Sequence, residues 1–165
     1  MRLPNYSRCF VCGHGNPRGL NVRFDTDGHK VWAEFNPAEE QMGYHGLTHG
    51  GVLSALLDEC MGWAACVRRG VFFLAAELTV RFQKPVALGQ RLLVEGEIVT
   101  ERNRLCECQG RILDEAGAVL VRAQGKFIPV SADETQRIID YLADESEVPW
   151  PRELYELRDR LARGM

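Results

Sequence analysis

The feature that most constrains the fold is one strongly apolar helical segment set between stretches of strand-like sequence. From residue 52 to residue 68, apolar side chains recur every three or four positions, the spacing of a helix buried on most of its surface. These positions are Val52, Leu53, Leu56, Leu57, Cys60, Met61 and Ala64, and Gly70 ends the predicted helix. Such a helix needs an enclosing layer, and the rest of the chain offers mainly sheet.

Extended segments lie on both sides of this helix. Before it, apolar and polar residues alternate at residues 22–24 and 31–35 around a turn at residues 25–28, which predicts a hairpin. After it, strands are predicted at residues 74–84, 91–101, 105–113 and 119–129. This order predicts an α+β domain in which an antiparallel sheet wraps around one central helix.

Two flanking regions complete the organisation. Residues 8–21 are rich in Gly, Pro and Asn, which predicts a turn-dense lead-in. Residues 131–165 offer two further helices at the periphery, over residues 132–142 and 152–162. We therefore predict one domain over residues 1–130 and a C-terminal helical extension over residues 131–165.

Composition and charge argue against several classes of protein. A chain of 165 residues with 45% hydrophobic and 26% charged residues suits one globular domain. The net charge of -3 argues against nucleic acid as a partner, since binding it needs clustered Lys and Arg. The N-terminal residues lack the apolar core of a signal peptide, and no apolar run approaches about 18 residues. We expect a cytoplasmic protein with no membrane partner.

The six cysteines are expected to be reduced thiols, because no export signal accompanies them. Cys9 and Cys12 form the only CxxC pair. A structural zinc site normally needs four ligands, and no second CxxC or HxxxH follows at finger spacing. We therefore predict a structural turn at this pair, and neither a metal ion nor a cofactor.

The stretch from Gly43 to Gly51, GYHGLTHGG, and the helix after it carry the residues suited to chemistry. Gly50 and Gly51 at a helix start let backbone N–H groups approach a ligand, and the helix dipole favours an oxyanion there. Asp58 follows Gly51 by seven residues, or two turns, so both lie on one helical face. An unpaired carboxylate in an apolar helix is costly, so Asp58 needs a function or a partner.

Structural roles are open for each of these side chains. Asp58 could cap a neighbouring loop or lie exposed at the edge of the helix. His49 could be a satisfied histidine at the helix start, and His45 an ordinary loop residue. Glu59 points about 100° away from Asp58 around the helix, and we assign it to the surface or to an interface.

Three segments together resemble one family. The block HGGVLSALLDECMG at residues 49–62 closely resembles the signature of PaaI-like hotdog thioesterases. LTVRFQKP at residues 78–85 resembles the family's long strand after the helix. CFVCG at residues 9–13, with NPRGL at residues 16–20, resembles a lead-in found in one branch. The resemblance covers about residues 8–129 and implies the hotdog fold, an antiparallel sheet wrapped around a central helix.

The resemblance also implies a homodimer, or a dimer of dimers, with active sites at the subunit interface. By position, Asp58 matches the catalytic acid, which acts as nucleophile or as general base on water. The Gly50 N–H of the other subunit matches the group that polarises the thioester carbonyl. His49 matches the motif's histidine, which shapes that loop. Asp58, Gly50 and His49 are thus the predicted catalytic residues.

The sequence departs from the family's pattern at two places. Many members have Asn or Gln six residues before the motif histidine, where this chain has Gly43; His45 or Gln41 could substitute. Some members have Ser or Thr near the start of the strand after the helix, where this chain has Leu-Ala-Ala at residues 74–76.

Binding residues are predicted around this block. The set is Gly43, His45, Gly51, Thr79 and Arg81. Candidate cations for the phosphates of coenzyme A are Arg68, Arg69, Arg81 and Lys84, each of which could instead be ordinary solvated charge.

The activity implied is hydrolysis of an acyl-CoA, or a related acyl thioester, to the free acid and CoA, without any cofactor besides the CoA of the substrate. The alternative is a hotdog module that binds acyl-CoA without catalysis, which the missing polar residue at Gly43 favours. Hotdog dehydratases and hydratases use a histidine with an acidic partner to move protons at carbon, and the His49-to-Asp58 block fits hydrolysis better.

Overall fold

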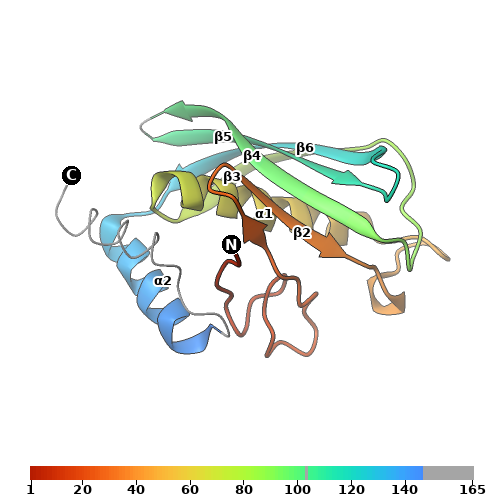
Figure 1. The fold of residues 1–165 in the computed structure, drawn as a ribbon, viewed down its shortest axis with the longest axis horizontal. Helices are drawn as coiled ribbons and strands as arrows, with labels where there is room; N and C mark the ends of the chain where they lie inside the picture. Colours follow the sequence, from red (N-terminus) through yellow and green to blue (C-terminus); the bar gives the residue numbers. More distant parts are fainter. Residues whose placement is uncertain (103, 147–165) are drawn as a thin grey trace.

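The structure is a computed structural model that describes residues 1–102 and 104–146. Its elements are β1 (Asp25–Thr26), β2 (Lys30–Phe35), a 3-10 helix (Glu39–Gln41), α1 (Gly50–Arg69), β3 (Phe73–Phe82), β4 (Leu92–Arg102), β5 (Leu105–Leu113), β6 (Val119–Pro129) and α2 (Ala132–Glu145). Figure 1 shows α1 lying against one face of the curved sheet. The predicted α+β hotdog arrangement is confirmed.

The sheet has the strand order β1-β2-β4-β5-β6-β3, and every neighbouring pair is antiparallel. Although β3 follows α1 directly, it pairs with β6 at the far side of the sheet. Within the described ranges, the other edge of β3 has no strand partner. The element next to the central helix therefore presents an open row of backbone hydrogen-bonding groups.

Small residues in the middle of the sheet let α1 approach closely. Gly96 on β4 pairs with Gly110 on β5, which pairs in turn with Ala123 on β6. A Cβ added at Gly96 would lie 3.0 Å from the backbone carbonyl of Cys60. By length and composition alone α1 could cross a membrane, but its packing beneath the sheet explains why it is so apolar.

Both ends of α1 extend slightly beyond the predicted helix. His49 caps the N-terminus, so the helix begins at Gly50. At the other end Gly70 adopts a left-handed φ of 72° and donates its N–H to the Cys66 carbonyl at 2.8 Å. Such a left-handed cap is typical of glycine.

The first strand begins later than predicted. Residues 22–24 are not part of the sheet, because their backbone groups bond to the N-terminal lead-in: Val22 N–H donates to the Val11 carbonyl at 2.9 Å. Asn21 interrupts extended structure with a φ of 53°. The turn accordingly moves to residues 27–29, where Gly28 has a φ of 92°.

The C-terminal helix α2 packs on the N-terminal segment. Ile139 and Leu142 are buried, and the rings of Tyr6 and Tyr141 stack at 4.9 Å. The first predicted C-terminal helix is therefore confirmed. The second, over residues 152–162, lies outside the described residues, and the boundary between residues 130 and 131 remains a prediction.

Candidate active site

His49 organises the start of α1. Its Nδ1 accepts a hydrogen bond from the Gly51 N–H at 2.9 Å, which satisfies one of the N–H groups exposed at a helix start. The backbone N–H of His49 donates to the Gln41 carbonyl at 2.8 Å and connects the preceding loop to the helix. His49 is thus placed to shape the backbone around Gly50.

The Gly50 N–H remains available for a ligand. No described residue accepts a hydrogen bond from it, whereas the neighbouring Gly51 N–H is occupied by His49. A Cβ at position 50 would lie 3.1 Å from Cζ of Phe82, near the end of β3. A side chain at position 50 would therefore crowd this ring, and the free N–H lies at the positive end of the helix dipole.

Asp58 faces an open recess of about 280 Å³ between α1 and β3. The lining residues are Ser54, Ala55, Asp58, Ala75, Ala76, Glu77 and Leu78. The Asp58 carboxylate is half-buried and has no hydrogen-bond or ion-pair partner among the described residues. Desolvation by burial raises the pKa of Asp58 above its ordinary value.

A bulge in β3 shapes the other wall of this recess. The register between β3 and β6 shifts between Ala75 and Glu77, so Ala76 is an extra residue opposite β6. Such bulges are common next to active sites, where they re-aim side chains. The two alanines keep the space beside Asp58 open, and they occupy the place where some relatives have Ser or Thr.

Asp58 and Gly50 of one chain are too far apart to act on one carbonyl. They are eight residues apart on the same helix, which corresponds to roughly 12 Å along its axis. Reacting groups must approach to about 3–3.5 Å. A site that uses both groups must therefore take one of them from elsewhere.

The sequence matches the model of the thioesterase superfamily over residues 45–133, which is more than half of the chain. The chain belongs to the thioesterase superfamily. No curated protein matches it. Solved structures agree with this assignment and with the PaaI-like hotdog resemblance, which is confirmed.

The thioesterase superfamily protein RHA08564 is 28% identical, with a TM-score of 0.68 over 73% of this chain and 62% of that one. This chain therefore spans less than two-thirds of that protein. The protein smu.793 from Streptococcus mutans UA159, solved bound to acetyl CoA, is 17% identical, with a TM-score of 0.64 over 67% and 90% of the two chains. PaaI from the Escherichia coli phenylacetic acid degradation operon is 18% identical, with a TM-score of 0.63 over 68% and 81%.

In this thioesterase superfamily member, Gly43 lies against the cap of α1. A Cβ at position 43 would be 3.0 Å from the Cα of His49, so this backbone leaves little room for the polar side chain found in many relatives. The side chain of Gln41 is occupied, because its Oε1 accepts the Ala38 N–H at 2.7 Å. His45 is exposed on the same loop and remains the candidate substitute.

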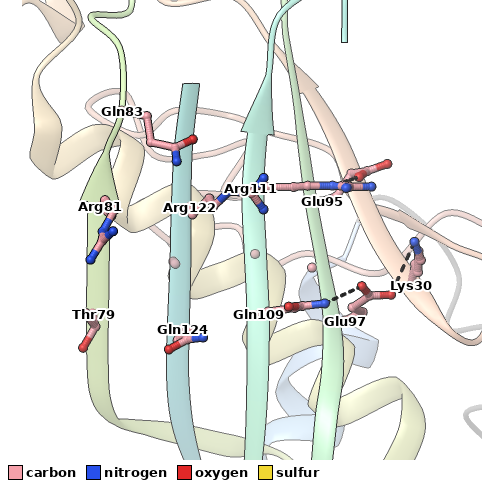
Figure 2. Close-up of a pocket in the computed structure, with 13 residues that line it drawn as sticks. Lys30, Thr79, Arg81, Gln83, Glu95, Glu97, Gln109, Arg111, Arg122 and Gln124 are labelled. Carbon is pink, nitrogen blue, oxygen red and sulfur yellow. Dashed lines mark hydrogen bonds and ion pairs between the residues drawn. The ribbon is translucent and has the colours of Figure 1, made fainter. Parts of the chain in front are cut away.

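Thr79 and Arg81 lie on the outer face of the sheet, away from Asp58. They line a polar hollow of about 550 Å³, shown in Figure 2, together with residues of β4, β5 and β6. Arg81 is opposite Arg122 in the register of β3 and β6. The structure thus divides the predicted binding residues between the helix start and this outer hollow.

Two of the candidate cations are paired with the sheet. Arg68 and Arg69 lie 3.8 Å and 3.3 Å from the carboxylate of Glu101. Exposed ion pairs of this kind contribute little to stability. These contacts fit the interpretation of Arg68 and Arg69 as ordinary surface charge. Lys84 lies just after β3, and its backbone N–H donates to the Leu120 carbonyl.

The assignment of Glu59 to the surface or to an interface was wrong. Its Oε1 lies 3.6 Å from the Cys9 thiol sulfur, which belongs to the N-terminal lead-in. Burial, followed by the nearby Cys9, raises the pKa of Glu59 to about 7. The lead-in folds back over this face of α1, which helical periodicity alone could not show. The CxxC pair, predicted only as a structural turn, was the available signal.

Proposed function

We propose that this chain hydrolyses an acyl-CoA, or a related acyl thioester, to a free acid and CoA. Asp58 acts as the nucleophile or as the general base on water. The Gly50 N–H binds the carbonyl oxygen as negative charge develops on it. The observation that carries the proposal is a half-buried carboxylate without a partner, facing an open recess, on a helix whose first N–H is also without a partner among the described residues.

A second copy of the chain would supply the missing half of each site. The unpaired edge of β3 carries exposed apolar side chains, including Leu74 at 66% and Phe82 at 52% exposure. In a two-fold symmetric dimer, two such edges would pair antiparallel. The start of one β3, beside Asp58, would then lie near the end of the other, beside Gly50.

The chemistry of a thioester suits this small set of groups. Its carbonyl is weakly stabilised by resonance, and its thiolate leaves without first being protonated. A raised pKa makes Asp58 a stronger base, provided that the pKa stays below the working pH. One oxyanion donor typically contributes about 10²- to 10³-fold in rate, so the Gly50 N–H is a substantial part of the machinery.

Coenzyme A as the leaving group is supported by the acetyl CoA bound to smu.793, which shares this fold. Arg81 and Arg122 make no ion pair with any described residue, so both are available to the phosphates of a bound CoA. Thr79 and Arg81 would contact the ligand only where it extends over the outer face of the sheet.

A second candidate is an acyl-CoA-binding module without turnover. Gly43 favours it, because the polar side chain that orients water or the carbonyl in many relatives is missing and the backbone leaves little room for it. This candidate and the hydrolase share the ligand but differ in product formation.

Thiol release from short, medium, long and aromatic acyl-CoAs tests the proposal. We expect release by the wild-type protein and a loss of about 10²- to 10⁴-fold in Asp58→Asn, which keeps the side-chain shape. Asp140→Asn, an exposed carboxylate on α2, is the control and should keep full activity. An Asp58→Asn protein with wild-type activity would remove the assignment, and tight binding without thiol release would favour the binding module.

A further inference from the structure

The N-terminal lead-in brings two thiols against one carboxylate of α1. The sulfur atoms of Cys9 and Cys12 and a carboxylate oxygen of Glu59 all lie within 4.8 Å of one another. Cys12 is buried, while Cys9 and Glu59 are half-buried, so the cluster lies between the lead-in and α1. Cys9 and Glu59 are 50 residues apart in the sequence, so this proximity is created by the fold.

The CxxC turn directs backbone N–H groups at the Cys9 sulfur. The N–H groups of Val11 and Cys12 both donate to the Cys9 sulfur, at 3.3 Å and 3.4 Å. The Gly13 N–H donates to the Cys9 carbonyl at 3.1 Å, and a Cβ at Gly13 would lie 2.3 Å from that oxygen. Only glycine fits this turn, and N–H donors aimed at a sulfur favour the thiolate, which is the form that binds metals.

The distance between the Cys9 sulfur and the Glu59 carboxylate oxygen fits two ligands of one tetrahedral ion. With Zn–S of about 2.3 Å and Zn–O of about 2.0–2.2 Å, tetrahedral angles place sulfur and oxygen ligands roughly 3.5 Å apart. The Cys9 sulfur and the Glu59 Oε1 are 3.6 Å apart. A zinc ion could therefore bind between them with little movement of the backbone.

We propose that Cys9, Cys12 and Glu59 bind one zinc ion, with water in the fourth position. Two thiolates and a carboxylate match the ligand preference of Zn²⁺ better than that of Mg²⁺ or Ca²⁺.

The ion would join the lead-in to the central helix. Glu59 points about 100° away from Asp58 around α1, so the zinc site and the recess of Asp58 lie on different faces. Because the unfolded chain holds no preformed site, zinc binding adds directly to folding stability. This inference replaces the expectation of no metal, which rested on the two ligands visible in the CxxC pair alone.

Metal titration of the reduced, chelator-treated full chain tests the proposal. We expect one Zn²⁺ per chain in competition with a chromophoric chelator, and a higher melting temperature with zinc. With Co²⁺ as the probe, thiolate-to-cobalt charge transfer and the visible bands of a tetrahedral ion should appear. Absence of metal uptake under reducing conditions, or a Cys9–Cys12 disulfide formed in air with no metal uptake after reduction, would overturn it.

Ligand variants locate the site. Cys9→Ser, Cys12→Ser and Glu59→Gln should each weaken zinc binding by more than about tenfold, since losing even an outer-shell partner costs roughly 10- to 100-fold. Cys66→Ala, a buried cysteine of α1 outside the cluster, should bind zinc like the wild type. Circular dichroism checks the fold of each variant. Unchanged affinity in folded Glu59→Gln would contradict the assignment of the third ligand.

Discussion

Asp58 is buried enough to lose solvation but has no described partner that would offset the loss, and its pKa is raised above 3.8 as a result. Only the ionised carboxylate can act as nucleophile or base. The value of kcat/KM should therefore rise with pH through an inflection above the usual Asp range and then level off. A pH–rate profile checks this; a rate already constant below pH 3.8, in protein that stays folded, would contradict it.

The same shift predicts how Asp58→Asn changes stability. A raised folded-state pKa means that the folded protein holds the proton more tightly than the unfolded chain does. Asp58 therefore reduces the free energy of unfolding progressively as pH rises from about 3.8 through its folded-state pKa. The Asn variant should melt at or above the wild-type temperature at neutral pH, which would separate its loss of activity from misfolding.

Gly50→Ala adds one methyl group beside the proposed oxyanion donor and so tests the role of the Gly50 N–H. The added Cβ would press on the Phe82 ring at 3.1 Å and displace the N–H at the start of α1. We expect kcat to fall by about 10²- to 10³-fold. Gly62→Ala, on the same helix with only ordinary contact at 3.7 Å, is the matched control. It should keep activity and gain about 0.5–1 kcal/mol of stability; full activity in Gly50→Ala would argue against this role of Gly50.

At the scale of elements, the distance between α1 and the sheet depends on Gly96 and Gly110. A Cβ at Gly96 meets helix backbone at 3.0 Å, whereas the two nearest atoms to one at Gly110 belong to the side chains of Leu57 and Met61, with the Glu95 carbonyl oxygen next at 3.3 Å. Gly96→Ala should cost about 1–3 kcal/mol, and Gly110→Ala less, because side chains can shift where backbone cannot. Denaturant unfolding of the two variants checks the order; equal stability would mean that α1 moves freely on the sheet.

Elements with a local signal could be predicted from the sequence. The periodicity of α1 and the alternation in β3 to β6 gave these elements to within about two residues, because neighbouring side chains specify them. The first strand was misplaced, because residues 22–24 bond to the lead-in and not to β2. Local alternation shows that a segment is extended, but it does not identify the partner of that segment.

The candidate site was predictable in part for the same reason. Asp58, Gly50 and His49 lie in one continuous block whose helical spacing orders them. The placement of Thr79 and Arg81 on the outer face depends on the pairing of β3 with β6, which no local pattern contains. The contact of Glu59 with Cys9 likewise depends on a chain reversal across 50 residues.

For the whole molecule, the open edge of β3 and the separation of Asp58 from Gly50 point to one arrangement. Each copy carries a carboxylate beside the start of β3 and a free N–H beside its end. Two-fold pairing of these edges would build two equivalent sites, each using Asp58 from one copy and Gly50 from the other. Neither copy would hydrolyse a thioester alone.

Mixing two inactive variants tests this arrangement most directly. Asp58→Asn and Gly50→Ala are co-expressed or unfolded and refolded together, and thiol release from an acyl-CoA is compared with that of each variant alone. Half of the random dimers would contain one of each chain and one intact site, so about a quarter of the wild-type activity should return. Activity no higher than that of the separate variants, in a mixture shown to contain mixed dimers, would contradict a site shared between two copies.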